Sequence, residues 1–215
     1  DPKKVYINLN RVARHHRCML MDSLIENDLL KYGYNTWGDT YEAFASYKSF
    51  VNPNTKIDQQ TFDVLDIEDL SSINPNNFVP TRHCKESFLF LNTETNINSN
   101  ELFFSEKVYK PLGIGMPFIT LGNPGTLQDL RSRGFLTFND WFDETYDLDL
   151  PLQTRIQIIT DNIKKYSKYS LEDLQKIRSE MTDLLEHNLN LYTSMYKKNW
   201  LKESITTYVQ ELKWK

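Results

Sequence analysis

Short apolar runs alternate with helical segments between residues 87 and 134, and this alternation constrains the fold more than any other feature. The runs at 87–91 (SFLFL) and 117–121 (PFITL) are too short to form buried helices, so they predict buried strands. A helical segment follows each of them. The order strand, helix, strand, helix is typical of a parallel sheet flanked by helices. We therefore expect an α/β protein with a Rossmann-like parallel sheet and a helical C-terminal third.

The two helices between and after these strands have recognisable ends. Ser105 is the expected N-cap of the first helix, which ends near Gly113 or Gly115. Thr126 is the expected N-cap of the second, which ends before Gly134. The Gly-Asn-Pro-Gly sequence at 122–125 lacks the spacing of a dinucleotide-binding fingerprint, so we interpret it as a turn.

The N-terminal segment predicts one further strand and helix. Residues 4–9 alternate like a short strand, and Asn10 is the expected N-cap of a helix that runs to about Lys31, with Gly33 just past its end. The apolar stripe of this helix consists of Leu20, Met21, Leu24, Ile25 and Leu29. Residues 34–87 contain two turn clusters and one candidate strand at 61–67 (TFDVLDI), without a strong helical pattern.

The last third of the chain shows helical periodicity. Apolar residues recur at helical spacing over 152–163, over 171–184 and over 201–212, and Ser170 with Asp173 forms a capping signal before the second stretch. We interpret these stretches as core-facing helices. The chain then divides into a Rossmann-like region, residues 1–150, and C-terminal helices, residues 151–215, packed on the same domain. The alternative is a separate helical hairpin that binds a partner.

Composition restricts the class of protein. The chain has 215 residues and a net charge of −4, so broad electrostatic binding to nucleic acid is not expected, although a local basic patch stays open. No apolar run approaches the roughly 20 residues that span a bilayer, and the first residues have no signal-peptide pattern. Cys18 and Cys84 are too few for a disulfide scaffold. We expect a cytoplasmic protein without a membrane segment. The chain does not begin with Met, so it could be a piece of a longer protein.

Two loops at the expected carboxyl ends of strands carry candidate anion-binding groups, because ligands of open parallel sheets bind at that edge. The first loop contains RVARHHR, in which Arg11, Arg14 and Arg17 are spaced by three and are expected to share one side of a helix start. Three cations at a helix N-terminus oppose the helix dipole, and a bound anion would remove this conflict.

The second loop ends in Ser105-Glu106-Lys107, where free backbone N–H groups and the Lys107 ammonium could hold a phosphate. A diphosphate between the loops would contact Arg on one side and Lys on the other. The ordinary alternative for each cation is a solvated or ion-paired side chain. His15 and His16 are adjacent and form a poor metal pair, so surface or capping roles are expected, and His83 is expected to be structural.

The ordered motifs carry a resemblance. An Arg-bearing first helix, FLFLNTET, SEK, PFITLG and a Gly-Phe before an aromatic and acidic segment together resemble the donor-binding half of α1,3-fucosyltransferases and related GT-B glycosyltransferases. The sequence is also similar to virus- and phage-encoded proteins with SEK-x-x-K-P and Gly-Phe-x-Thr-Phe, which would imply the host cytoplasm. The resemblance covers roughly residues 5–38 and 86–147.

The resemblance implies roles for particular residues. Lys107 and Arg17 would contact the donor diphosphate, with Arg14 as the alternative to Arg17. Glu106 would bind the ribose hydroxyls, and Glu94, in a longer loop than the family has, would lie near the sugar or base. Ser105 belongs to the same substrate-binding set, and residues 34–39 (YNTWGD) correspond to a loop that touches the nucleotide.

The implied activity is inverting transfer of a sugar from a nucleotide donor, such as a GDP-sugar, to a hydroxyl of a glycan or other acceptor. Arg17 and Lys107 would stabilise the leaving diphosphate without a metal ion. Asp147-Leu-Asp149 has metal-ligand spacing, but we expect a solvated turn there.

In the family the general base comes from an acceptor-binding half, and this sequence begins where the donor half begins. A missing segment or partner chain would then supply the base, or residues 40–85 would do so, and the catalytic residues are unknown. Two alternatives stay open: a non-catalytic nucleotide-sugar or phosphate-binding module, and a glycosyltransferase that acts on nucleic acid. The second would need a basic face formed by Lys164, Lys165, Lys168, Lys197, Lys198 and Lys202.

Overall fold

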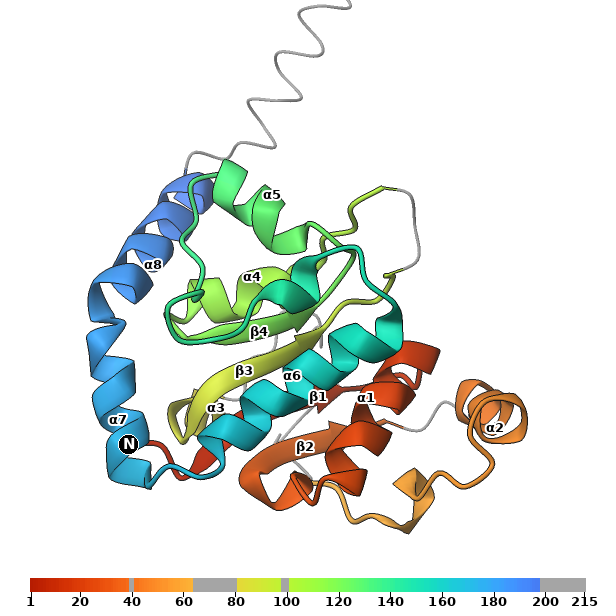
Figure 1. Ribbon diagram of the computed structural model, residues 1–215. Coiled ribbons are helices and arrows are strands. Elements are labelled where there is room, and N and C mark those ends of the chain that lie inside the picture. The colour runs from red at the N-terminus through yellow and green to blue at the C-terminus, as the bar shows by residue number, and fades with distance from the viewer. Residues whose placement is uncertain (39–40, 64–80, 98–100, 198–215) are drawn as a thin grey trace, which may run out of the picture.

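A four-stranded parallel sheet forms the centre of the protein, as the computed structural model shows for residues 1–38, 41–63, 81–97 and 101–197 (Figure 1). The strands are β1 (Lys4–Asn10), β2 (Gly33–Trp37), β3 (Ser87–Thr93) and β4 (Phe118–Leu121), in the spatial order β2-β1-β3-β4. Helices flank the sheet. The expectation of an α/β protein with a Rossmann-like parallel sheet is therefore confirmed.

The direction in which the chain crosses the sheet reverses between β1 and β3. From β1 the chain passes through α1 (His15–Glu26) to β2 on one side. From β3 it passes through α4 (Glu106–Gly113) to β4 on the other side. The loops that leave β1 and β3 therefore diverge from adjacent strands. This reversal is the position at which open parallel sheets hold their ligands.

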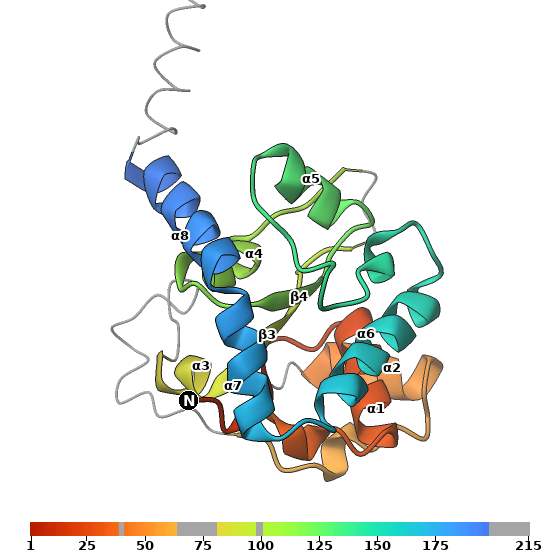
Figure 2. The ribbon, with the colours of Figure 1, turned by 60° about the vertical axis from the view of Figure 1, so that its left-hand side comes forward.

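The helices form two groups around the sheet (Figures 1 and 2). Helix α6 (Leu152–Tyr166) packs on α1, and α8 (Thr182–Lys197) packs on α4. The remaining helices are α2 (Tyr41–Phe50), α3 (Thr81–Lys85), α5 (Thr126–Ser132) and α7 (Leu171–Glu180). Single 3-10 turns occur at Leu30–Tyr32, Ile57–Gln59 and Thr145–Asp147.

The core lies on the central strands, which explains their composition. Every residue of β3 is buried, as expected for a strand covered on both faces. The Phe88 ring packs against Tyr166 of α6 at 5.1 Å between ring centroids and against Phe142 at 6.3 Å. Because three aromatic side chains from distant segments meet here, the last third of the chain shares a core with the sheet.

The expected first helix is shorter than its periodicity predicted. It runs from His15 to Glu26 and not from residue 10 to residue 31, and its N-cap is Arg14. Asn10 is instead the last residue of β1, because it continues the pairing with β2 opposite Trp37. Gly33 does not end a helix but begins β2, and the Tyr6 ring occupies the space where a Cβ at Gly33 would lie.

The expected caps of the later helices are confirmed in part. Ser105 is the N-cap of α4, and Ser170 with Asp173 forms a complete capping box at α7. Gly125, with φ of +83°, is the N-cap of α5 in place of Thr126, which is the first helical residue and whose hydroxyl donates to the Asn123 carbonyl. The stretch from 171 to 184 is divided into two helices at Met181.

The middle of the chain holds elements that the sequence did not predict. Helix α2 and strand β2 both lie in the region without a strong periodic signal. Of the candidate strand at 61–67, residues 61–63 are described and are not a strand, and the remainder lies outside the described residues. The expected helix at 201–212 also lies outside them.

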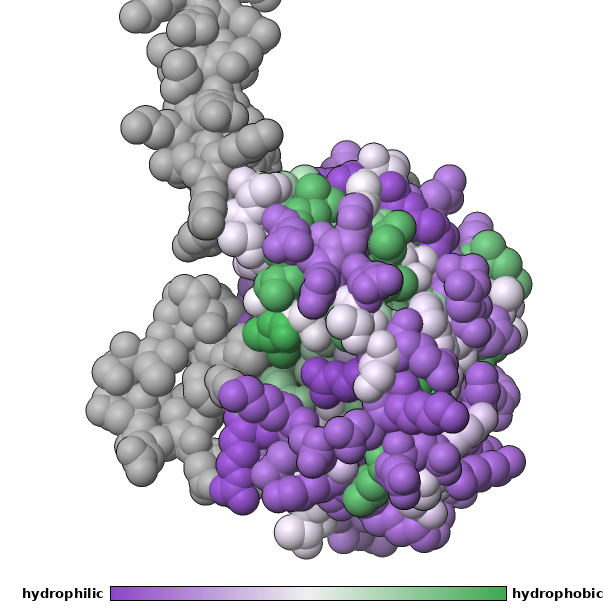
Figure 3. Space-filling model, turned by 90° about the vertical axis from the view of Figure 1, so that its left-hand side faces the viewer, coloured by the Kyte–Doolittle hydropathy of each residue, from purple (hydrophilic) through white to green (hydrophobic). Residues whose placement is uncertain are grey.

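The surface over α7 and α8 is mainly hydrophilic, and its apolar side chains occur in separate small groups (Figure 3). Among the helices of the described ranges, none has the length and apolarity needed to cross a bilayer. Cys18 and Cys84 are both buried and unpaired, and burial raises the pKa of each thiol to about 12. A thiol held in its neutral form is a poor nucleophile, so both act as small core residues.

Candidate site at the reversal between β1 and β3

The loops that leave β1 and β3 are joined directly by hydrogen bonds. His16, in the first turn of α1, has its Nε2 atom 2.8 Å from the carbonyl oxygen of Glu94, the first residue after β3. Arg17 donates to the same carbonyl at 3.3 Å and to that of Thr93 at 3.2 Å. The two segments that the sequence nominated for anion binding therefore meet at the carboxyl edge of the sheet.

Arg17 is buried at this junction. Only 3% of its surface is exposed, and its guanidinium also donates to the Val12 carbonyl at 2.9 Å. Burial and, to a smaller extent, the nearby charge of Arg14 lower its pKa to about 10, against the opposing charges of Glu94 and Glu106. The Nε atom has no hydrogen-bond partner among the described residues. Arg17 thus carries its charge inside the protein, with most of its donors directed to backbone carbonyls.

The other cations of RVARHHR lie before the helix. Arg14 is the N-cap of α1 and is exposed, and Arg11 is exposed in the preceding loop. The expectation that Arg11, Arg14 and Arg17 share one side of a helix is therefore wrong, because only Arg17 is helical. Arg14 contributes no side-chain cap, and the first turn of α1 has no acidic residue. The free backbone N–H groups at the start of α1 therefore lie beside positive side chains, and no acidic residue of the first turn compensates this charge.

His16 is a second buried basic group, with 6% of its surface exposed. Burial lowers its pKa to about 4, and the charges of Arg17 and Arg14 act in the same direction, although the hydrogen bond to Glu94 opposes them. His16 is therefore neutral at pH 7. His15 is exposed, and its ring lies 5.7 Å from the Tyr47 ring of α2.

Glu94 is fully buried, and its carboxylate is used inside the protein. Oε1 accepts from the backbone N–H of Ser105 at 2.8 Å. Oε2 accepts from the Ser105 hydroxyl at 2.6 Å and from the Thr95 backbone N–H at 2.9 Å. Glu94 therefore connects the end of β3 to the start of α4.

Ser105, Glu106 and Lys107 form the start of α4, in partly exposed positions. The Ser105 hydroxyl accepts from the Lys107 backbone N–H at 3.3 Å. The Lys107 ammonium lies 2.6 Å from Glu106 Oε1, and the two side chains are 24% and 32% exposed. Burial opposes ionisation of Glu106, but the hydrogen bond and charge of Lys107 outweigh it, so the pKa of Glu106 is lowered.

A chain of buried polar side chains lies beneath the site and was missed by the sequence reasoning. Thr93 donates its hydroxyl to Asn10 Oδ1 at 2.9 Å, and Asn10 donates through Nδ2 to Asn8 Oδ1 at 2.9 Å. The available signal was the appearance of Asn and Thr at the ends of otherwise apolar strands. These contacts hold the carboxyl ends of β1 and β3 in a fixed relation.

The segment YNTWGD divides between the two ends of the sheet. Tyr34 donates its hydroxyl to Glu86, which precedes β3, so it lies at the amino end. Its ring contacts His83 at 4.8 Å, which gives His83 a packing role. Gly38 lies at the carboxyl edge, where a Cβ would be 1.9 Å from the Arg11 carbonyl oxygen. Asp39 lies outside the described residues.

Asp147 is not part of a solvated turn, contrary to expectation. It is 6% exposed, and its Oδ2 atom accepts from the backbone N–H groups of Leu127 and Gln128 in the first turn of α5. Burial raises its pKa to about 6. Asp149 is exposed, so the two carboxylates do not point to one position. Among the described residues, no group of three His, Cys, Asp or Glu side chains could hold a metal ion.

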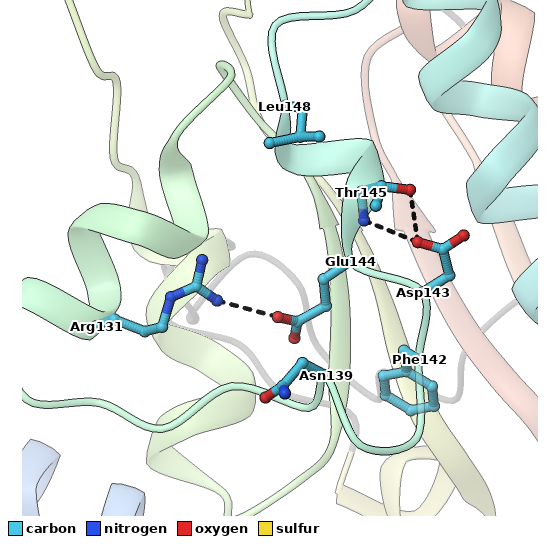
Figure 4. A pocket seen from close by; sticks show the side chains of 7 residues that line it. All are labelled: Arg131, Asn139, Phe142, Asp143, Glu144, Thr145 and Leu148. Atoms are coloured by element: carbon cyan, nitrogen blue, oxygen red, sulfur yellow. Dashed lines mark hydrogen bonds and ion pairs between the residues drawn. The ribbon is translucent and has the colours of Figure 1, made fainter.

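An open hollow of about 530 Å³ lies beside α5, and none of its lining residues belongs to the candidate site (Figure 4). It is lined by Arg131, Asn139, Phe142, Asp143, Glu144, Thr145 and Leu148. Arg131 pairs with Glu144 at 3.0 Å, and Asp143 accepts from Thr145. Since these polar groups are hydrogen-bonded to one another, we interpret the hollow as a structural feature of the surface and not as a ligand site.

Of the lysines whose clustering would favour a nucleic-acid substrate, Lys164 and Lys165 are exposed in the last turn of α6, and Lys168 is exposed just after it. Lys165 donates to the Trp141 carbonyl at 3.0 Å. The side chains of Lys197, Lys198 and Lys202 lie outside the described part of the chain.

Comparisons of the sequence and structure with protein-family models, with curated proteins and with solved structures find no match.

Proposed function

We propose that the protein binds the diphosphate of a nucleotide sugar at the reversal between β1 and β3 and transfers the sugar to an acceptor hydroxyl. One observation carries the proposal: the N-terminal turns of α1 and α4, with Arg14, Arg17 and Lys107, converge where the chain direction reverses. Helix N-termini and basic side chains together favour a phosphate. The resemblance to the donor-binding half of fucosyltransferases supports the same ligand.

The groups differ in how they would act. Lys107, on release from Glu106, and the exposed Arg14 would contact phosphate oxygens, whereas buried Arg17 supplies positive charge from inside the protein and fixes the Glu94 carbonyl. When the bond between the anomeric carbon and the diphosphate breaks, negative charge develops on the leaving oxygen. Cations already in place stabilise this charge without reorganisation. Glu106 would bind the ribose hydroxyls.

A calorimetric titration of the protein with GDP, UDP and the corresponding nucleotide sugars tests the proposal. Lys107→Gln should weaken binding of the preferred nucleotide at least about tenfold, the value of one charge-assisted hydrogen bond. Lys164→Gln removes an equal charge from an exposed position on α6 and should leave the affinity unchanged. The proposal fails if no nucleotide binds, or if both variants bind as tightly as the wild type.

A non-catalytic nucleotide-sugar-binding module is the second candidate, and one observation favours it. The two carboxylates of the candidate site already have partners: Glu94 is bound to Ser105, and Glu106 is paired with Lys107. A general base needs an accessible lone pair on a group of suitable pKa. Sugar transfer to added acceptors, followed as release of nucleoside diphosphate, distinguishes the candidates: the module binds nucleotide sugars but releases no diphosphate above the uncatalysed rate.

A further inference from the structure

We infer that Glu94 is a positioning residue, which fixes the phosphate-binding start of α4 without contacting the ligand. The inference rests on the proposed function and sharpens it, because the resemblance alone would place Glu94 beside the sugar or base. Three observations support it: the burial of the carboxylate, the identity of its partners and the double attachment of the Glu94 backbone.

The carboxylate has no free surface with which to meet a ligand. Glu94 is 0% exposed, and each oxygen accepts at least one hydrogen bond of 2.9 Å or less. Since a buried carboxylate must be satisfied internally, these contacts are a condition of its burial. A ribose or sugar hydroxyl could reach Glu94 only by breaking them.

The partners of the carboxylate are the groups that define the start of α4. Both the backbone N–H and the hydroxyl of Ser105 donate to Glu94, eleven residues earlier in the chain. The Ser105 hydroxyl in turn accepts from the Lys107 N–H and caps the helix. Glu94 therefore sets the position of the N-cap, and through it the positions of Glu106 and Lys107.

The backbone of Glu94 is fixed from the other side. Its carbonyl accepts from His16 and Arg17, both in the first turn of α1. One residue thus joins α1, β3 and α4. Because the two helix starts belong to opposite branches of the sheet, their separation depends on this connection, and a diphosphate that spans them requires a fixed separation.

The test uses Glu94→Ala and Glu94→Gln with GDP as the probe, UDP replacing it if UDP is the nucleotide that binds the wild type. Glutamine can accept the Ser105 N–H through Oε1 and donate to the Ser105 hydroxyl through Nε2, so it preserves the connection to α4 without the charge. It loses only the contact with the Thr95 N–H, which Nε2 cannot accept. Alanine removes the connection. We expect Glu94→Ala to weaken nucleotide binding about tenfold or more, and Glu94→Gln to restore affinity to within about threefold.

Asp147→Ala is the matched control for general destabilisation. Asp147 is also a buried carboxylate that accepts from two groups at a helix start, but its helix is α5. Its loss should lower the melting temperature while leaving the nucleotide affinity within about twofold of the wild type, because α5 lies outside the site.

Amide hydrogen exchange separates this inference from the proposed function, since it needs no ligand. Glu94→Ala should accelerate exchange at Ser105 and in the first turn of α4 by at least about tenfold, and Glu94→Gln should not. If no nucleotide binds the wild type, the proposed function fails, but the exchange experiment still decides the positioning role. Unchanged exchange in Glu94→Ala overturns the inference. Nucleotide binding lost equally in both variants, with exchange altered only in Glu94→Ala, also overturns it, because the carboxylate charge would then contact the ligand.

Discussion

Acidification should loosen the candidate site through His16. The unfolded chain binds a proton at His16 with a pKa near 6.5, whereas burial lowers the folded value to about 4, with Arg17 and Arg14 adding to the effect. The folded state therefore binds fewer protons between these values, and stability is lost as the pH falls from 6.5 to 4. At about 1.4 kcal/mol per pKa unit, the loss is about 3 kcal/mol.

The measurement is urea denaturation, followed by circular dichroism, at pH 7.5, 6, 5 and 4 and constant ionic strength. Asp147 has a raised pKa of about 6, so its own contribution falls as the pH rises from 3.8 to 6 and opposes the His16 effect. The comparison of wild type with His16→Gln removes this background, because both proteins contain Asp147. The stability advantage of the wild type over the variant should shrink by about 3 kcal/mol between pH 7.5 and pH 4.

His187→Gln is the matched control. His187 also places Nε2 at 2.8 Å from a backbone carbonyl, that of Gly134, but in an exposed position. Its replacement removes an imidazole–carbonyl contact of the same length from the surface, and so measures the cost of losing such a contact without burial. A difference between wild type and His16→Gln that stays constant over the whole pH range would refute the reasoning, as would a His16 resonance that titrates near pH 6.5 in the folded protein.

Three further substitutions test other contacts. Gly38→Ala forces a Cβ against the Arg11 backbone and should cost about 3 kcal/mol in urea denaturation, so a change below about 0.5 kcal/mol would contradict the close approach. Asp22→Ala leaves three donors from residues 47–55 without their acceptor, so it should lower the free energy of unfolding by about 3 kcal/mol or more. It should also make α2 susceptible to limited proteolysis, and a cleavage pattern identical to that of the wild type would contradict this prediction. Glu106→Gln should release Lys107 and so increase the affinity for inorganic pyrophosphate, measured by calorimetry, about threefold. The same variant should bind GDP more weakly than the wild type does, and equal effects on the two affinities would exclude a ribose contact.

The sequence predicted the strands and helices where local pattern and packing agree. The run 88–91 is apolar because β3 is covered on both faces, and Ser105 was predictable as a cap because its capping contact, with the Lys107 N–H, is local. Asn10 shows the opposite case. It is an excellent cap by type, but its backbone continues the sheet and its side chain binds Asn8 and Thr93. Those partners are tertiary contacts and cannot be read from neighbouring residues.

Helix α2 shows a similar limit. Its residues have no strong periodic pattern, and the segment that contains it is fixed through Asp22 of α1, whose carboxylate accepts from Tyr47, Asn52 and Thr55. A buried carboxylate and a small apolar cluster around Tyr47 thus take the place of the broad apolar face that predicts a helix from sequence. These contacts with α1 are tertiary, so they are not visible in the neighbouring sequence.

The candidate site was predictable in location and less so in detail. That Arg17 and Ser105 belong to one edge follows from the rule for open parallel sheets. Their direct connection depends on β3 pairing with β1 and not with β2, which is a property of the strand order. Only with that order do the carbonyls of Thr93 and Glu94 come within reach of Arg17. The residue type of Arg17 predicted a cation at this edge of the sheet, but it did not predict that the guanidinium donates to backbone carbonyls.

The charge balance of the site determines how it could accept a phosphate. Two helix N-termini converge with the cations Arg14, Arg17 and Lys107, and the carboxylates of Glu94 and Glu106 compensate them. Glu94 is buried with its oxygens engaged, so it cannot be exchanged at low cost. The Glu106–Lys107 pair is partly exposed, and such pairs contribute little to stability. A diphosphate would therefore displace Glu106 from Lys107 and leave Glu94 in place, which frees the Glu106 carboxylate for a hydroxyl of the same ligand.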